Sequence, residues 1–407
     1  MDSKTDIVLE PHQLKAVKEL HDGAVLYGKT GSGKTYTALQ YYKENWQDNP
    51  SQQGQPLIVI TTAKVRNTGS WVKSAENLGV KDITVDSWNN IEKYKNSHAF
   101  FIFDEQKTLG YGKWSRLFIH IARRNNWILL SATVGDEWKD YRAIMIANGY
   151  YKNKGDFDNQ HIVYNPYVNF PQILKYINTI RLTGIARKIL VPMPDKRTTT
   201  RHDHYIQTDY NEVEYKKTQK DRFNYEEKRP IRNTSEYTQT LRRIVSSSND
   251  RIARTMDLIR KLDRVIIFYN YNFEKGILIR ELEENNIPTF QYNGKKHDEL
   301  PEGDRWAYVV QYNASEGWDA ITTNNIIFYS PNYSYKVIEQ AKGRIDRLNN
   351  TYQDLHYYFL GSPASIDIAV FKAIAGKRKF NESTWKEAVN AYGQGATTAI
   401  SDNPPLT

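Results

Sequence analysis

The sequence predicts an α/β fold of two tandem parallel-sheet lobes with a helical insert between them. Short runs that are apolar throughout alternate with helical stretches in the first 150 residues, and the same pattern returns after residue 263. Strands that are apolar on both faces are typical of a parallel sheet covered by helices on both sides. At 407 residues the chain is also longer than one ordinary hydrophobic core supports.

The apolar runs define the expected strands of each lobe. In the first lobe they lie at residues 24–27, 57–60, 83–85, 100–103 and 127–130. In the second lobe they lie at residues 265–268, 308–310, 326–329 and 355–359. We therefore expect two sheets, each built from strands that are separated by helices.

Changes in composition along the chain predict five parts. Residues 1–150 form the first lobe, residues 151–204 a connecting segment, and residues 205–262 a charged, helical part of the second lobe. Residues 263–392 complete the C-terminal lobe. Residues 393–407 are rich in Gly, Thr, Asp and Pro and are expected to form a flexible tail.

The charge balance favours a polyanionic partner, most often nucleic acid. The formal net charge is +9, although this value also fits simple solubility. The chain contains no cysteine, which excludes disulfides and thiolate metal sites. No apolar run approaches the roughly 20 residues of a membrane span. We expect a cytoplasmic protein that does not bind membranes.

A glycine-rich segment at residues 28–35 fits the pattern G-x-x-x-x-G-K-[ST] between an expected strand and an expected helix. Backbone N–H groups of such a loop close on phosphate oxygens, and the helix start adds a favourable dipole. Lys34 would reach the β- and γ-phosphates, and the Thr35 hydroxyl would ligate Mg²⁺. A chance glycine turn is the alternative. The predicted ATP contacts are Gly28, Thr30, Gly31, Ser32, Gly33, Lys34 and Thr35.

A glutamine upstream of this loop could contribute to nucleotide binding. Gln13 precedes an expected helix, and its amide could read the adenine edge because it carries both a donor and an acceptor. An ordinary surface glutamine is the alternative.

Two carboxylates follow the apolar run at residues 100–103. In an open α/β sheet, ligands bind at the carboxyl ends of the strands. Asp104 is therefore expected to hold Mg²⁺ through its water shell, and Glu105 to orient and deprotonate the attacking water. The alternative is that both carboxylates lie in a solvent-exposed turn without a catalytic role.

A basic segment at residues 340–347 could supply arginines to the same triphosphate. Arg344 and Arg347 are three residues apart, so we expect them to share a helix face. Both could stabilise charge on the γ-phosphate in the transition state. Gln340 could position the water or sense the γ-phosphate. The alternative is a basic helix face without a catalytic role.

Residues 28–35, 104–107, 131–133 and 340–347 together resemble motifs I, II, III and VI of superfamily-two helicases and translocases. The resemblance covers roughly residues 8–380 and implies two RecA-like lobes with the ATP site in the cleft between them. Other segments are similar to motifs of the Swi/Snf-type branch. These segments are residues 11–13, 57–71, 192–196, 265–268, 315–319 and 365–367.

The chain departs from the family pattern at two places. Lys107 stands where motif II usually has histidine. Glu316 and Trp318 make motif V more similar to phage and restriction-type relatives, so we expect a minimal phage or bacterial form. Gly317 and Asp319 are expected on the loop after the strand at residues 308–310, and the resemblance implies that Asp319 lies near the ribose of the nucleotide or bridges toward the DNA contacts. A turn with a capping aspartate is the alternative.

Polar and basic residues after the expected strands are candidates for contacts with nucleic-acid phosphates, which set register without reading sequence. Trp88 could stack on a base or pack in the core. The candidates are Thr62, Lys64, Arg66, Ser87, Trp88 and Ser315.

The sequence thus predicts an ATP-dependent DNA helicase or translocase with ATP and Mg²⁺ as cofactors. The expected partner is duplex, forked or branched DNA, with RNA less favoured. A monomer working with replication or recombination proteins in a bacterial cell, possibly phage-encoded, is expected. An RNA helicase and a nucleotide-gated DNA-binding clamp without unwinding are the alternatives.

Overall fold

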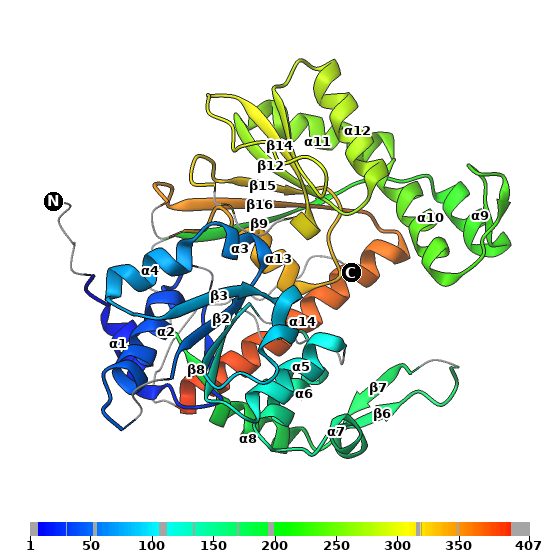
Figure 1. Ribbon diagram of the computed structural model, residues 1–407. Helices are drawn as coiled ribbons and strands as arrows, with labels where there is room; N and C mark the ends of the chain where they lie inside the picture. Colours follow the sequence, from blue (N-terminus) through cyan, green and yellow to red (C-terminus); the bar gives the residue numbers. More distant parts are fainter. Residues whose placement is uncertain are drawn as a thin grey trace. The chain divides into compact units, whose positions relative to one another are not determined.

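The computed structural model divides into two compact units, each built around a six-stranded sheet (Figure 1). Unit 1 comprises Met1–Asp195 and Lys379–Thr407, and unit 2 comprises Lys196–Arg378. Every pairing within both sheets is parallel, which confirms the predicted α/β fold with two parallel-sheet lobes. The structure describes residues 7–29, 31–51, 55–105, 112–132, 135–168, 171–193, 199–314, 318, 320–347 and 350–391.

The sheet of unit 1 has the strand order β3-β2-β4-β5-β1-β8. Its strands are β1 (Val25–Tyr27), β2 (Leu57–Thr61), β3 (Ile83–Ser87), β4 (Phe100–Asp104), β5 (Trp127–Ser131) and β8 (Leu190–Pro192). Successive strand residues point to opposite faces, so Phe101 and Phe103 enter one core while Phe100 and Ile102 enter the other. This alternation explains why the strands are apolar throughout.

Helices cover both faces of this sheet (Figure 1). One core contains α1 (Pro11–Glu19), α2 (Lys34–Tyr42) and α4 (Ser70–Leu78). The other contains α5 (Lys113–Ala122), α6 (Trp138–Ala147), α7 (Lys154–His161) and α8 (Thr179–Ile189). A short helix, α3 (Ala63–Asn67), follows β2.

The sheet of unit 2 has the strand order β13-β14-β12-β15-β16-β9. Its strands are β9 (Thr200–Gln207), β12 (Arg264–Tyr269), β13 (Thr289–Tyr292), β14 (Trp306–Gln311), β15 (Asn325–Phe328) and β16 (Asp354–Gly361). One face packs against α13 (Tyr335–Lys342), and the other against α11 (Asn249–Lys261) and α12 (Asn272–Glu284). The two faces again bury alternate strand residues in separate cores.

The remaining elements lie at the periphery of the two units. They are the hairpin of β6 (Ile162–Tyr164) and β7 (Ile173–Tyr176), the helices α9 (Glu212–Asp221) and α10 (Thr234–Ser246), the short strands β10 (Phe223–Asn224) and β11 (Arg229–Pro230), and α14 (Ser365–Ala391). Helix α14 begins in unit 2 and ends in unit 1. None of the helices in the described ranges is long and apolar enough to cross a membrane.

All nine expected strands are confirmed, and three further strands join the sheets. Strands β8 and β9 lie at sheet edges, and β13 lies at the opposite edge from β9. Strand β9 alternates polar and charged residues along its length and stays largely exposed, so it has no apolar run to reveal it. Strand β13 is also only partly buried, whereas β8 is apolar and fully buried but only three residues long.

The segment predicted to connect the lobes is structured in unit 1. Residues 151–193 contain α7, β6, β7, α8 and β8, and β8 pairs with β1 at the edge of the sheet. The division between the units falls at residues 195 and 196. The predicted connecting segment, residues 151–204, differs from this division. Its aromatic and proline residues interrupt the patterns from which helices and strands are predicted. The predicted tail at residues 393–407 lies outside the described residues.

A buried carboxylate links three helices of unit 2. Asp367 in α14 accepts hydrogen bonds from Arg251 Nη2 at 2.6 Å and from Arg242 Nη1 at 3.3 Å. Arg242 and Arg251 belong to α10 and α11, and all three side chains are almost completely buried. The Ser362 hydroxyl donates a further bond to Asp367. Two buried guanidinium groups therefore depend on one carboxylate.

We predict that Asp367→Asn strongly destabilises unit 2. The substitution leaves two buried arginines without their negative partner, which typically costs about 3–5 kcal/mol. Urea unfolding followed by circular dichroism measures this loss. The control is Asp304→Asn, because Asp304 is fully exposed and pairs with Arg264 at the surface, where one ion pair contributes about 0–1 kcal/mol. Equal unfolding midpoints for the two variants would contradict the prediction.

Candidate active site

The carboxyl edge of the unit 1 sheet brings the predicted phosphate loop and the acidic pair together. Strand β5 lies between β1 and β4, with Tyr27 opposite Ser131 and Asp104 opposite Leu130. Because these strands are parallel and in register, their carboxyl ends meet at one edge. The loop after β1 and the carboxylates after β4 therefore lie two strands apart on the same edge.

Two glycines of the phosphate loop have no room for a side chain. The Gly28 amide donates to Ser131 O at 3.1 Å, and a Cβ at Gly28 would lie 2.8 Å from Met193 Cβ. Gly33 has φ of +82°, and a Cβ there would lie 2.3 Å from Gln13 Nε2. Close packing behind the loop thus keeps its backbone accessible from the other side.

The lysine of the loop folds over it. Lys34 Nζ donates to the carbonyl oxygens of Gly28 and Lys29 at 2.6 and 2.7 Å. Lys34 is also the first residue of α2, with Thr35 next in the first turn. The first-turn N–H groups and the helix dipole favour an anion at this point. Gly31 and Ser32 are described within the loop, whereas Thr30 lies outside the described residues.

Gln13 holds the loop from behind. Its side chain is buried, Nε2 donates to Gly33 O at 3.1 Å, and Oε1 accepts from the Glu10 amide at 2.8 Å. These contacts give Gln13 a positioning role at the helix start. Its reading of adenine stays a prediction.

Asp104 is held by neutral donors at the end of β4. Its Oδ2 accepts from Thr61 Oγ1 at 2.8 Å and from Trp71 Nε1 at 3.0 Å. Burial, together with the charge of Glu105, raises the pKa of Asp104 to about 6, and the two hydrogen bonds and Lys34 oppose this rise. Thr61 and Trp71 are the supporting residues that the sequence did not reveal.

Glu105 has a backbone conformation that is rare for a residue with a side chain. Its φ is +61°, in the left-handed region. Such conformations cost about 1–3 kcal/mol and gather at functional sites. This strain agrees with a catalytic assignment for Glu105. Lys107, which replaces the usual histidine of motif II, lies outside the described residues, as does Thr133 of motif III.

The structure separates the nucleic-acid candidates of unit 1 into surface and core residues. Trp88 is buried, donates from Nε1 to Asp104 O at 3.0 Å and packs on Phe103. Ser87 is buried as well. Neither side chain offers a free surface to DNA, so Trp88 follows the core alternative and supports Asp104.

Three candidates after β2 remain near the surface. Thr62 caps α3 by accepting from the Val65 amide at 3.3 Å. Lys64 lies in α3 and is partly exposed. Arg66 forms an ion pair with Asp86 at 3.1 Å while its side chain stays one-third exposed. Contacts of these residues with nucleic acid stay predictions.

The arginines of unit 2 lie beyond a helix and not along it. Helix α13 ends at Lys342 and is followed by Gly343, so the predicted shared helix face for Arg344 and Arg347 is wrong. Arg344 is buried and donates to Trp318 O at 2.7 Å and to Gln340 O at 3.2 Å. Gly343 keeps right-handed helical angles and the chain leaves the helix there, which the spacing of two arginines does not reveal.

Strand β9 holds this basic segment in place. Arg201 in β9 forms ion pairs with Glu339 at 2.8 Å and with Asp346 at 2.6 Å. Asp203 in β9 pairs with Lys342 at 2.6 Å. These ion pairs involve residues on both sides of Gln340. The sequence did not predict them because β9 has no run of apolar residues that would identify it as a strand. Three further candidates, Ser315, Gly317 and Asp319, lie outside the described residues.

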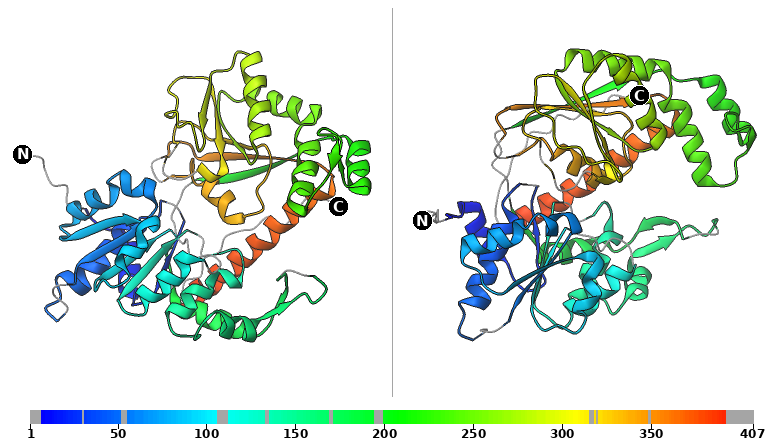
Figure 2. Two further views of the ribbon diagram at one scale, coloured as in Figure 1. Left: turned by 45° about the vertical axis from the view of Figure 1, so that its right-hand side comes forward. Right: turned by 45° about the horizontal axis from the view of Figure 1, so that its top comes forward.

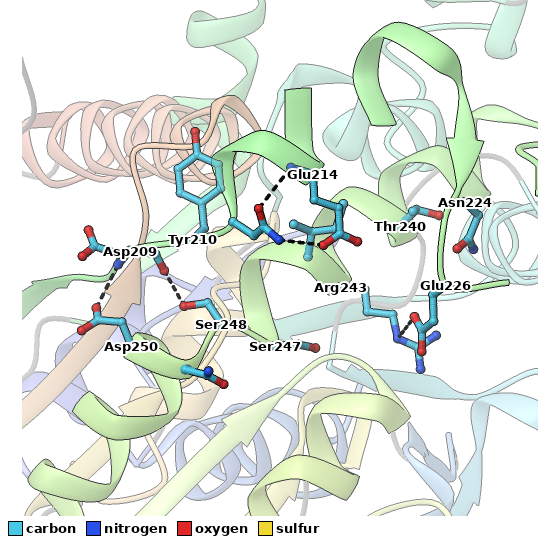
Figure 3. Close-up of a pocket in the computed structure, with 13 residues that line it drawn as sticks. Asp209, Tyr210, Glu214, Asn224, Glu226, Thr240, Arg243, Ser247, Ser248 and Asp250 are labelled. Carbon is cyan, nitrogen blue, oxygen red and sulfur yellow. Dashed lines mark hydrogen bonds and ion pairs between the residues drawn. The ribbon is translucent and has the colours of Figure 1, made fainter. Parts of the chain in front are cut away.

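A cavity of about 540 Å³ in unit 2 is a poor place for a triphosphate (Figure 3). Its lining includes Asp209, Glu214, Glu226 and Asp250, with Arg243 paired to Glu226 at 2.9 Å. Carboxylates repel phosphate groups. Among the residues that the structure describes, no cluster of three or more His, Asp or Glu side chains is arranged to hold a metal ion.

Comparisons with known proteins find similarity at the level of structure. No protein-family model matches the sequence, and no curated protein matches it. The solved structures that it resembles include the SWI2/SNF2 ATPase core of Sulfolobus solfataricus, determined in complex with double-stranded DNA. The identity is 15%, the alignment covers 96% of each chain, and the TM-score is 0.43. This TM-score supports no conclusion about the function of the present chain.

The raised pKa of Asp104 predicts a pH dependence of stability in the nucleotide-free protein. The folded pKa of about 6 exceeds the usual value of 3.8, so folding favours the protonated carboxyl. This stabilisation is complete below about pH 4 and is lost as the pH rises through about 6, for a total of up to about 3 kcal/mol.

Urea unfolding between pH 4 and 7.5, in a chelating buffer, measures this dependence beside Asp104→Asn. Asp140 also has a pKa raised by burial to about 6 and remains in both proteins. The difference between the two stability curves therefore isolates Asp104. Parallel curves over the whole range would contradict the prediction.

Proposed function

We propose that this chain is an ATP-dependent DNA helicase or translocase, which couples hydrolysis of Mg-ATP to movement on DNA or remodelling of it. One observation carries the proposal: the phosphate loop with Lys34 and the pair Asp104 and Glu105 share one sheet edge. A loop that presents N–H groups and a lysine binds phosphates. Adjacent carboxylates supply the groups that hydrolysis needs.

The residues of unit 1 fit the roles that hydrolysis requires. Lys34 lies at the helix N-terminus, where it would draw the β- and γ-phosphates onto the loop. Glu105 would orient the attacking water and accept its proton. The strained backbone of Glu105 supports this role because it fixes the direction of the side chain.

The oxygen atoms of Thr35 and Asp104 suit magnesium, which prefers hydroxyl and carboxylate ligands beside phosphates and water. When bound, this ion would neutralise charge on the phosphates. Asp104 accepts hydrogen bonds from the neutral donors Thr61 and Trp71. Above about pH 6 its carboxylate is therefore negatively charged and not neutralised by these donors, and it could attract a cation.

The basic segment of unit 2 would complete the site. We infer that Arg344 and Arg347 meet the γ-phosphate held by unit 1, with Gln340 nearby, and stabilise charge in the transition state. The anchoring of this segment to β9 supports the proposal because catalytic arginines need fixed positions. Binding and release of the γ-phosphate would close and open the two units and so move the protein along DNA.

DNA is the proposed polymer because the net charge of +9 favours a polyanion. Thr62, Lys64 and Arg66, which follow β2, would contact its phosphates. We include forked and branched DNA because a role in replication or recombination is expected.

We predict that Glu105→Gln abolishes ATP hydrolysis while the protein still binds ATP. The amide cannot accept a proton, and losing a general base typically costs about 10²–10⁴-fold in rate. Phosphate release is measured without polymer and with single-stranded, duplex and forked DNA and RNA. Glu76→Gln, at an exposed position of α4, is the control. Equal rates on every polymer, or an active Glu105→Gln variant, would contradict a DNA motor. Stimulation by RNA alone would indicate an RNA helicase.

We also predict that Arg347→Ala lowers DNA-stimulated hydrolysis by about 10³-fold or more, with little loss of DNA affinity. The guanidinium would act on transition-state charge and not on the polymer. Arg305→Ala, which removes an exposed arginine of the same unit, is the control. Retained hydrolysis with lost DNA binding would reassign Arg347 to the polymer and count against the proposed site.

A further inference from the structure

The hairpin of β6 and β7 is an extended arm of unit 1 that the proposed hydrolysis does not use. It follows α7 and extends from the rest of its unit in both views (Figure 2). The strands pair antiparallel, with Ile162 opposite Tyr176. A two-stranded hairpin alone is marginally stable in water, so such an arm needs anchoring and a reason to be retained.

The arm is anchored at its base. Tyr176 Oη donates to Glu137 Oε2 at 2.6 Å, next to the start of α6. The Ile177 amide donates to His161 O at 2.9 Å. Further out, the Asn165 amide donates to Gln172 O at 2.7 Å. These hydrogen bonds therefore hold the hairpin in a defined orientation on unit 1.

Beyond these anchors, the arm exposes large side chains to solvent. Tyr167 is 93% exposed and Leu174 is 60% exposed. Tyr164, Ile177 and Ile180 are exposed beside them. The Tyr167 amide donates to Asn165 Oδ1, which fixes the turn that presents this ring. Large exposed apolar and aromatic groups on a projecting element are typical of an interaction site.

The charge of the arm indicates what it contacts. From residue 159 to residue 194 the sequence contains no Asp or Glu, although the chain has 47 acidic residues in 407. Of the four cations in this stretch, Lys175 lies in the hairpin, whereas Arg181, Arg187 and Lys188 lie in α8. Residues 162–176 thus carry one cation and no carboxylate of their own, while Asp158 and Glu137 accept hydrogen bonds from Tyr164 and Tyr176. An aromatic surface with a cation is complementary to a polyanion that also carries flat rings.

We propose that the β6–β7 hairpin is a nucleic-acid-binding arm, in which Tyr167 packs against a base or sugar and Lys175 lies beside the phosphates. A two-stranded ribbon fits the major groove of a duplex, and tyrosine stacks on unpaired bases. Duplex and single-stranded DNA both present phosphates and bases to the arm, and the experiment below distinguishes which of the two forms it binds. The inference rests on the proposed action on DNA. The exposed aliphatic residues would also suit a protein partner, but the hairpin itself carries Lys175 and no Asp or Glu, which favours nucleic acid.

The test measures binding of labelled 20-base-pair duplex and 20-nucleotide single-stranded DNA by fluorescence anisotropy at several salt concentrations. The variants are Tyr167→Ala and Lys175→Gln. The matched control is Lys18→Gln, which removes an equal charge from an exposed position of α1 in the same unit. Leu174→Ala tests the aliphatic side of the arm. Polymer-free ATP hydrolysis is measured for each variant.

We expect Tyr167→Ala to weaken binding about fivefold or more on the DNA form that the arm contacts. Lys175→Gln should reduce the salt dependence by about one phosphate contact. Lys18→Gln should bind like the parent, and polymer-free hydrolysis should be unchanged in all of these variants.

Several results would overturn the inference. Parental affinity and salt dependence in both arm variants, while the parent binds DNA, would remove the arm from the interface and leave the proposed motor standing. A change of oligomeric state in Leu174→Ala, with normal DNA binding in the other two variants, would assign the arm to a protein partner. A parent that binds no nucleic acid would defeat the proposed function and the arm together.

Discussion

The candidate site depends on the parallel pairing of β5 with both of its neighbours. Tyr27 lies opposite Ser131, and Leu130 lies opposite Asp104, so three strands end within one residue of each other. A shift of one residue in the β4–β5 pairing would turn the Asp104 side chain to the other face of the sheet. The hydrogen bond from the Gly28 amide to Ser131 O then continues this register into the phosphate loop.

The carboxylates of Asp346, Asp367 and Asp104 are stabilised in two different ways, and the difference bears on function. In unit 2, Asp346 and Asp367 are buried in ion pairs with arginines, which neutralise the charge of each carboxylate. In unit 1, Asp104 receives hydrogen bonds from a hydroxyl and an indole, and its pKa rises to about 6. A carboxylate already paired with arginine has little attraction left for another cation, whereas Asp104 keeps that capacity.

The two units also hold their functional segments by different means. In unit 1, close packing of Met193 and Gln13 against glycines shapes the phosphate loop. In unit 2, ion pairs from Arg201 and Asp203 hold the basic segment after α13. Packing against glycine fixes a backbone that must itself contact a ligand. Ion pairs fix a segment whose side chains would act.

The sequence by itself determined nine of the twelve strands of the two six-stranded sheets and the order of the chemical segments along the chain. Central parallel strands are buried on both faces, so their hydrophobic signal is strong, and the phosphate loop needs its glycines and lysine at set spacings. Glu105 and Asp104 were found in the same way, because they follow such a strand.

Only the tertiary structure decided which residues support these segments. Thr61 and Trp71 reach Asp104 from β2 and α4, and no local pattern states that β2 lies beside β4. Trp88 lies in the core, and α13 ends at Lys342, before Arg344. Strand β9 and the β6–β7 arm carry polar or exposed residues, so they left no hydrophobic period to detect. Long-range pairing and burial come from the whole fold, and a local sequence window contains neither.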